Sequence, residues 1–178
     1  MNSVMTIRKI LTEPDPFLRQ KSKNVDIVNN DIQSLMDDML ETMYDAPGIG
    51  LAAIQIGVPK RIIVIDLSKD KEKKNPLYFV NPEILIKSEN DASYEEGCLS
   101  VPNQFAEISR PDKCKIKYLD YYGSEKILEA EGLLATCIQH EMDHLEGILF
   151  IDYLSKLKKS MIIKKLSKQK KTLERIVV

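Results

Sequence analysis

The chain has 178 residues, of which 43% are hydrophobic and 30% charged, and its formal net charge is −1. This length supports a domain with its own buried core, and the near-zero charge gives no overall attraction to DNA or to an anionic membrane surface. No apolar run approaches the roughly 18 residues that a membrane-spanning helix needs, and the apolar stretch near the N-terminus is too short for a secretory signal.

The first predicted helix follows an irregular segment, residues 1–30, which has neither a helical nor a strand period. From residue 31 onward, apolar side chains recur at helical steps and form one stripe. These residues are Ile32, Leu35, Met36, Met39, Leu40 and Met43. An Asn or Asp at positions 29–31 is a suitable N-cap, and Pro47-Gly48 ends the helix. We therefore expect an amphipathic helix whose methionine-rich face packs in the core.

Two segments after this helix have the composition of strands. Arg61–Leu67 is short and β-branched, which predicts a buried strand. Leu77–Val80 and Glu83–Ser88 are also predicted strands, and we expect Asn81-Pro82 to interrupt them. The preceding segment, Gly48–Gly57, is rich in small residues, so another backbone can approach it closely.

A β-hairpin is predicted in the second half of the chain. Lys113–Tyr121 alternates charged and apolar side chains, and Glu125–Ala130 returns after a turn that contains Gly123. The polar residues Glu89–Ser93 predict a loop well before this hairpin.

A His-Glu-x-x-His motif lies on the next predicted helix, Leu133–Leu145. His140 and His144 are the only histidines of the chain, and at this spacing both lie on one helical face, where they can bind a single metal ion. Glu141 is then placed to handle the proton of a water molecule. The motif is short and also occurs by chance, so a solvated helix remains an alternative on this stretch alone.

Three scattered cysteines compete to be the third ligand of an open catalytic site. Cys137 shares the helical face of His140 but lies about 10 Å from His144 along the axis, so it is better suited to be an apolar wall residue. Cys114 lies in an alternating strand and is expected in the core. Cys98 lies in a flexible Gly-Cys-Leu-Ser segment and is favoured over Cys137. An odd number of free thiols also indicates a reducing, cytoplasmic setting.

Three stretches together resemble the signature motifs of the peptide deformylase family, in the same order. They are Gly48–Gln55 (GIGLAAIQ), Glu96–Ser100 (EGCLS) and His140–His144 (HEMDH). The likeness extends between them, over roughly residues 5–157. It implies an α+β fold, with mostly antiparallel strands packed around a central helix that bears the third motif, together with an N-terminal and a C-terminal helix. Residues 1–178 are then expected to form a single catalytic domain.

The resemblance also implies a metal centre and a reaction. The implied metal ligands are Cys98, His140 and His144. The implied catalytic carboxylate is Glu141, while the Gln55 side chain and the Leu99 backbone N–H stabilise the oxyanion. Members of the family remove the formyl group from the N-terminal methionine of new proteins, generally with Fe²⁺. Zn²⁺, Ni²⁺ or Co²⁺ could substitute at a site of sulfur and nitrogen ligands.

Substrate contacts are predicted on both sides of this centre. Gly48, Ile49 and Gly50 are expected to present their backbone to the N-formyl-methionyl peptide as an added strand. Leu133 and Cys137, on the helical face of His140, are candidates for an apolar methionine pocket beside Ile49. Plain core packing is the alternative for each of them.

Three acidic residues are candidates for supporting the ligands. Asp143 is hypothesised to orient a ligand histidine or to pair with Arg110, with a solvated helix carboxylate as the alternative. Glu95 and Glu96 either support Cys98 or are solvated charges.

The tail from about residue 154 carries eight lysines between Lys156 and Lys171 and predicts a basic amphipathic helix. Either this helix docks on the ribosome, opposite RNA phosphates, or it is a solvated helix packed on the domain. The rival functions are a zinc endopeptidase, which would need neither Cys98 nor Gly48–Gln55, and a structural metal-binding module, in which Glu141→Ala would lose no activity.

Overall fold

The computed structural model describes residues 5–70 and 72–176, with side chains described up to Leu173. A five-stranded antiparallel sheet has the order β1-β2-β3-β6-β7, and β4 and β5 form a separate hairpin. The strands are β1 (Gly50–Ala52), β2 (Ile62–Ile65), β3 (Leu77–Lys87), β4 (Asp91–Cys98), β5 (Val101–Pro111), β6 (Lys113–Leu119) and β7 (Glu125–Glu131). The helices are α1 (Asn30–Asp45), α2 (Gly132–Leu145) and α3 (Lys156–Ile176), with 3-10 turns η1 (Pro16–Arg19), η2 (Ala53–Ile56) and η3 (Phe150–Tyr153).

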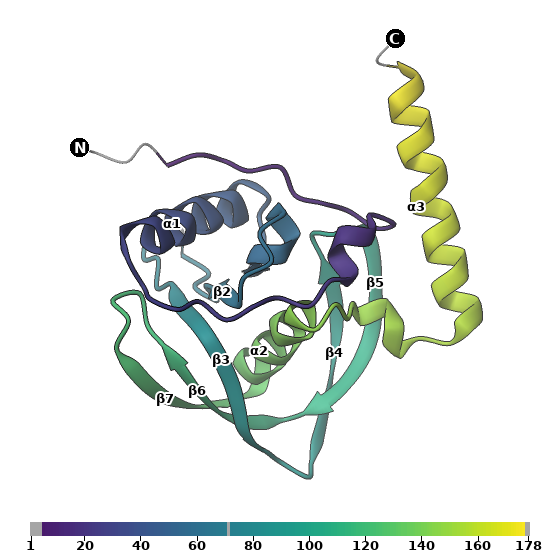
Figure 1. Ribbon diagram of the computed structural model, residues 1–178. Helices are drawn as coiled ribbons and strands as arrows, with labels where there is room; N and C mark the ends of the chain where they lie inside the picture. Colours follow the sequence, from purple (N-terminus) through teal and green to yellow (C-terminus); the bar gives the residue numbers. More distant parts are fainter. Residues whose placement is uncertain (1–4, 71, 177–178) are drawn as a thin grey trace.

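Helix α2 lies at the centre of the molecule, between the large sheet and the β4–β5 hairpin (Figure 1). Its apolar residues Ala135, Ile138 and Leu145 are fully buried and pack in one cluster with residues of β2, β3 and β6. Because α2 carries the His-Glu-x-x-His motif, the predicted α+β fold with antiparallel strands around this helix is confirmed.

Helix α1 covers the opposite face of the sheet. Side chains alternate along β2, so Ile63 and Ile65 pack toward α2 while Ile62 and Val64 pack against the methionine-rich stripe of α1. The predicted N-cap is confirmed at Asn29, whose side chain accepts a hydrogen bond from the first turn. A strand buried on both faces explains the continuous apolar run in this part of the sequence.

The β6–β7 hairpin is formed as predicted, with the predicted alternation of charged and apolar side chains. Cys114 and Ile116 point into the core, while the lysines that alternate with them point outward and pair with glutamates of β7. These exposed pairs are Lys113–Glu131 (3.3 Å), Lys115–Glu129 (3.4 Å) and Lys117–Glu125 (3.0 Å). The alternation of charged and apolar residues in this segment therefore reflects a sheet with one solvent-exposed face and one face packed on the core.

Two predictions about strands are wrong. Leu77–Val80 and Glu83–Ser88 are not separate, because β3 is continuous through Asn81-Pro82. A register shift absorbs Asn81, which has a φ of 50°, and its side chain bonds both backbone groups of Val25. The predicted loop Glu89–Ser93 is partly strand, since β4 begins at Asp91 and pairs with β5.

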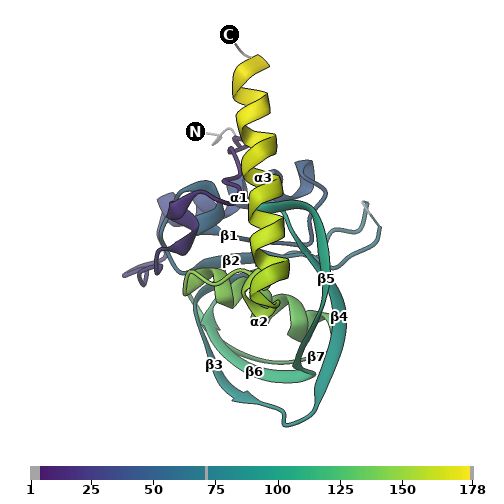
Figure 2. The ribbon, with the colours of Figure 1, turned by 90° about the vertical axis from the view of Figure 1, so that its right-hand side faces the viewer.

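The helix predicted from about residue 154 is α3, and only its first half packs on the domain. Ile162, Ile163 and Leu166 join a core cluster with Phe150 of η3 and Val101 of β5. Beyond residue 167 every described side chain of α3 is exposed, and the helix extends away from the body of the protein (Figure 2). No helix in the described part of the chain is long and apolar enough to cross a membrane.

Candidate active site

The end of β4 and the middle of α2 bring one thiol and two imidazoles together. Cys98 Sγ lies 3.3 Å from His144 Nε2, and the possible ligand atoms of Cys98, His140 and His144 all lie within 4.8 Å of one another. Cys137 does not belong to this group, which favours Cys98 between the two thiols left open by the sequence. Both histidines are buried, because α2 is covered by the sheet on one side and by the hairpin on the other.

A buried charge network holds His140 in place. Its Nδ1–H donates to Glu96 Oε2 at 2.8 Å, which leaves Nε2 to face the site. Arg110 clamps the same carboxylate with two hydrogen bonds of 2.6 and 3.0 Å, and it donates a third to Asp143 at 2.8 Å. The hypothesis that Asp143 pairs with Arg110 is confirmed. Glu96 differs from its prediction, because it supports His140 rather than Cys98.

The electrostatics of the cluster suit a cation. Burial lowers the pKa of His140, but hydrogen bonds to Cys98 and Glu96 and the charge of Glu141 outweigh burial and raise this pKa well above its usual value. The negative groups around His140 that favour this proton also favour a divalent metal ion in its place. Burial, aided by the positive charge of His140, lowers the pKa of His144, which keeps that imidazole neutral and able to bind metal.

Glu141 is a buried carboxylate with unused bonding capacity. It is 5% exposed, and its Oε2 has no hydrogen-bond partner among the described residues. Burial is the largest effect on this group and raises the pKa of Glu141 to about 7. Thiolate, two imidazoles and an adjacent unsatisfied carboxylate are the donor set of an open catalytic metal site, so the residues fit a divalent metal.

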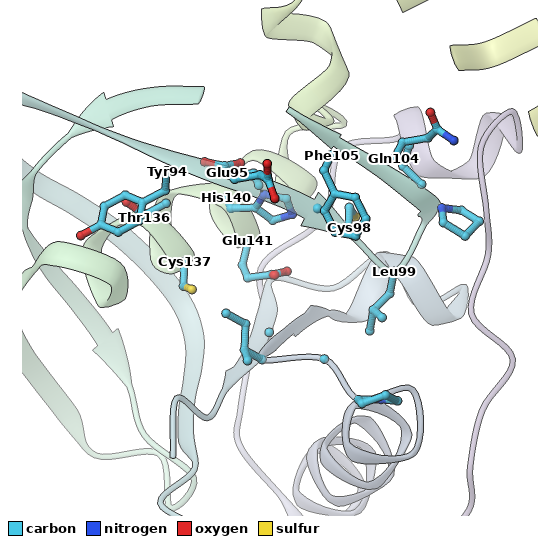
Figure 3. A pocket seen from close by; sticks show the side chains of 18 of the residues that line it. Tyr94, Glu95, Cys98, Leu99, Gln104, Phe105, Thr136, Cys137, His140 and Glu141 are labelled. Atoms are coloured by element: carbon cyan, nitrogen blue, oxygen red, sulfur yellow. Dashed lines mark hydrogen bonds and ion pairs between the residues drawn. The ribbon is translucent and has the colours of Figure 1, made fainter. Parts of the chain in front are cut away.

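A cavity of about 440 Å³ opens beside this cluster. All five predicted substrate-binding residues line it, namely Gly48, Ile49, Gly50, Leu133 and Cys137. Figure 3 shows Cys137 and Glu141 side by side on α2. Burial raises the pKa of Cys137 to about 12, so this thiol stays neutral and forms an apolar part of the wall.

Gln55 is fixed next to the thiol of Cys98. Its Oε1 accepts from Ala52 N at 2.9 Å, and its Nε2 donates to Ser100 Oγ at 3.0 Å and approaches Cys98 Sγ at 3.5 Å. Gln55 is 1% exposed, so its amide is held in one orientation. Leu99 lies in the turn between β4 and β5 and lines the same cavity.

The β4–β5 hairpin and α2 both contribute cavity residues that the sequence did not indicate. Tyr94 and Phe105 come from β4 and β5, and Thr136 comes from α2, one turn before His140 (Figure 3). The position of Thr136 four residues before His140 was a usable signal. No comparable signal marked Tyr94 or Phe105, because their hairpin was not predicted.

Comparisons with known proteins agree with the motifs and with the fold. A family model described as polypeptide deformylase matches residues 7–160. A peptide deformylase from Pelagibacter ubique is 68% identical over 174 residues, covering 98% of this chain and 100% of the relative. The crystal structure of a peptide deformylase from Ehrlichia chaffeensis in complex with actinonin is 44% identical, with a TM-score of 0.89, and the match covers 93% of this chain and 98% of that chain. A peptide deformylase structure from Legionella pneumophila is 46% identical, with a TM-score of 0.87, covering 96% and 99%.

Proposed function

The chain belongs to the polypeptide deformylase family, and on this premise we propose that Cys98, His140 and His144 hold the divalent metal ion of its active site. The protein is a hydrolase that removes the N-formyl group from the initiator methionine of newly synthesised proteins and releases formate. The single observation that carries the proposed site is the convergence of these three side chains next to the buried Glu141. We propose Fe²⁺ as the working metal and the cytoplasm as the location.

Glu141 is proposed to carry the proton through the reaction. A divalent metal at this site supplies Lewis acidity, which polarises a carbonyl and lowers the pKa of a water molecule. The Glu141 carboxylate accepts a proton from the attacking water and delivers it to the nitrogen of the methionine as the C–N bond breaks. The pKa of Glu141 is raised to about 7, chiefly by burial, so the same group can accept and release a proton near neutral pH.

Two groups are proposed to stabilise the oxyanion that develops on the formyl oxygen. Gln55 offers a side-chain amide that is already oriented by its bonds to Ala52 and Ser100. Leu99 offers its backbone N–H in the turn that follows Cys98. A donor that is oriented before the reaction stabilises the transition state by about 3 kcal/mol.

The peptide is proposed to extend the large sheet at β1. This strand lies at the end of the sheet order, so within the described residues one of its edges has no pairing strand. Gly48, Ile49 and Gly50 lie at this edge and line the cavity, where they can pair with an extended peptide backbone. The methionine side chain then enters the part of the cavity lined by Leu133 and Cys137.

The test is formate release from a formyl-methionyl peptide by the wild type and by Glu141→Gln, with the metal content of both measured. We expect the variant to bind metal normally and to lose at least about 100-fold in kcat, because the amide cannot accept the proton. An active, metal-replete variant contradicts the proposed role of Glu141. Cleavage of internal peptide bonds without formate release would favour a zinc endopeptidase.

We also propose that α3 docks on the ribosome. The exposed lysines of this helix face away from the side chains that join the core cluster, namely Ile162, Ile163 and Leu166. Charge reversal at Lys164, Lys165 and Lys168 should abolish co-sedimentation with ribosomes at low salt, because contacts with RNA phosphates are lost. The matched control reverses exposed lysines on other elements, Lys69, Lys87 and Lys126, and should still co-sediment. Equal sedimentation of both triple variants contradicts this proposal.

A further inference from the structure

Thr136 carries a buried hydroxyl group that the fold leaves without a hydrogen bond. The residue is 3% exposed, and its Oγ1 has no partner within the described part of the chain. Threonines in helices commonly donate to the carbonyl four residues earlier. Thr42 of α1 donates in this way to Asp38 O at 2.7 Å, and Thr172 of α3 donates to Lys168 O at 3.0 Å. Thr136 therefore departs from the pattern of the other two helices, at a cost in stability.

The position of this hydroxyl relates it to the substrate. Thr136 and Glu141 both line the cavity, and Thr136 lies four residues, about 6 Å along the helix axis, before His140. In the view of Figure 3, Thr136 and Tyr94 are both drawn on the side of the cavity away from Cys98, and both line the cavity. The substrate spans a similar length, because the thioether sulfur of methionine is five bonds from the formyl carbon.

The surroundings of Thr136 are suited to a thioether. Leu133 is apolar, and burial raises the pKa of Cys137 to about 12, so that thiol remains uncharged. Tyr94 adds an aromatic ring, which methionine sulfur contacts favourably. Sulfur is a weak hydrogen-bond acceptor, and it bonds best to a donor that has no competing partner.

We propose that the Thr136 hydroxyl is a specificity-determining group that donates a hydrogen bond to the sulfur of the substrate methionine. It thereby distinguishes methionine from a side chain of the same length and shape that lacks sulfur. This inference rests on the function proposed above, and it assigns a role to a residue that the motifs do not include.

The experiment pairs an isosteric substitution with an isosteric substrate. Values of kcat/KM are measured for formyl-Met-Ala-Ser and for formyl-norleucyl-Ala-Ser, in which a methylene replaces sulfur. We expect the wild type to prefer the methionyl peptide by about three- to tenfold, the size of one hydrogen bond, and Thr136→Val to have a ratio near one. Cys137→Ala is the matched control, because it enlarges the same wall without removing the hydroxyl. Cys137→Ala should lower kcat/KM for both peptides by a similar factor, and the preference for the methionyl peptide should remain.

The outcomes separate failure of this inference from failure of the proposed function. If Thr136→Val keeps the wild-type ratio, the inference is overturned while the deformylase activity stands. If the wild type releases no formate from either peptide, the proposed function is contradicted, and the inference that rests on it is contradicted as well. Should the valine variant not fold, Thr136→Ser, which keeps a hydroxyl, must retain the preference, and Thr136→Ala must lose it. Equal ratios in these two variants also overturn the inference.

Discussion

Gly50 offers a direct test of whether the position of Glu141 controls the rate. A Cβ atom added at Gly50 would lie 2.5 Å from Glu141 Oε1 and 3.0 Å from its Cδ. The glycines with positive φ are at other positions, so alanine suits the backbone of Gly50, and the three nearest atoms to the added Cβ all belong to the Glu141 side chain. Glu141 is 5% exposed and packed on the central helix, so its side chain has little free space into which to move.

The expected size of the effect follows from this distance. Carbon and oxygen atoms in ordinary contact are separated by about 3.5 Å, so the carboxylate of Gly50→Ala must shift by about 1 Å. A displacement of this size at a reacting group costs about 100-fold in rate. We therefore predict that kcat falls about 100-fold, while metal content remains at the wild-type level because Cys98 and the two histidines are not touched.

The assay is formate release under saturating peptide, with metal content measured on the same sample. A double-mutant cycle provides the control, since Glu141→Asp withdraws the carboxylate from Gly50 by one methylene. In that background Gly50→Ala should add little further loss. Wild-type kcat in Gly50→Ala, or the same loss in both backgrounds, refutes the reasoning that the glycine makes room for the carboxylate.

Three further predictions concern stability, each measured by urea denaturation. Arg110→Met leaves the buried Glu96 carboxylate without its main partner and should cost about 3–5 kcal/mol. Burial raises the pKa of Asp152, but hydrogen bonds from Lys159 and other donors lower it to a net value below 3.8. The advantage of the wild type over Asp152→Asn should therefore be complete above pH 3.8 and disappear as the pH falls through the lowered pKa. Thr42→Val should destabilise the protein by about 1–3 kcal/mol, because it removes a hydroxyl that donates to Asp38 O and accepts from Arg8 N.

The elements predicted correctly from the sequence are those with a strong period and one buried face. The stripe of α1 and the spacing of His140 and His144 on α2 each follow from helical geometry alone. The β4–β5 hairpin was missed because its alternating side chains are mostly polar, and several of them line the cavity rather than the core. The continuity of β3 was missed because Pro82 usually ends a strand, and only the register shift at Asn81 explains the exception.

The partners of the catalytic groups could not be predicted from spacing, because they are contacts between distant parts of the chain. Glu96 precedes His140 by 44 positions, and Arg110 lies between them in the sequence. The sequence alone leaves open whether a glutamate beside the Gly-Cys-Leu-Ser segment supports the neighbouring thiol or is a solvated charge. In a strand, however, successive side chains point to opposite faces, so Glu96 and Cys98 share a face while Glu95 points to solvent.

This alternation explains why one short strand can both complete and support the centre. Cys98 and Glu96 lie two residues apart on β4. Cys98 offers a possible ligand atom, and Glu96 orients the imidazole of His140 through its Nδ1. Arg110, from the paired strand β5, neutralises the carboxylate that would otherwise be buried without a countercharge. The hairpin and α2 therefore depend on each other: without the hairpin the histidines lack both their proposed third ligand and their orientation, and without α2 the charges of the hairpin have no buried partner. A shift of the β4 register by one residue would turn both side chains away at once, so metal retention and hairpin register should be lost together.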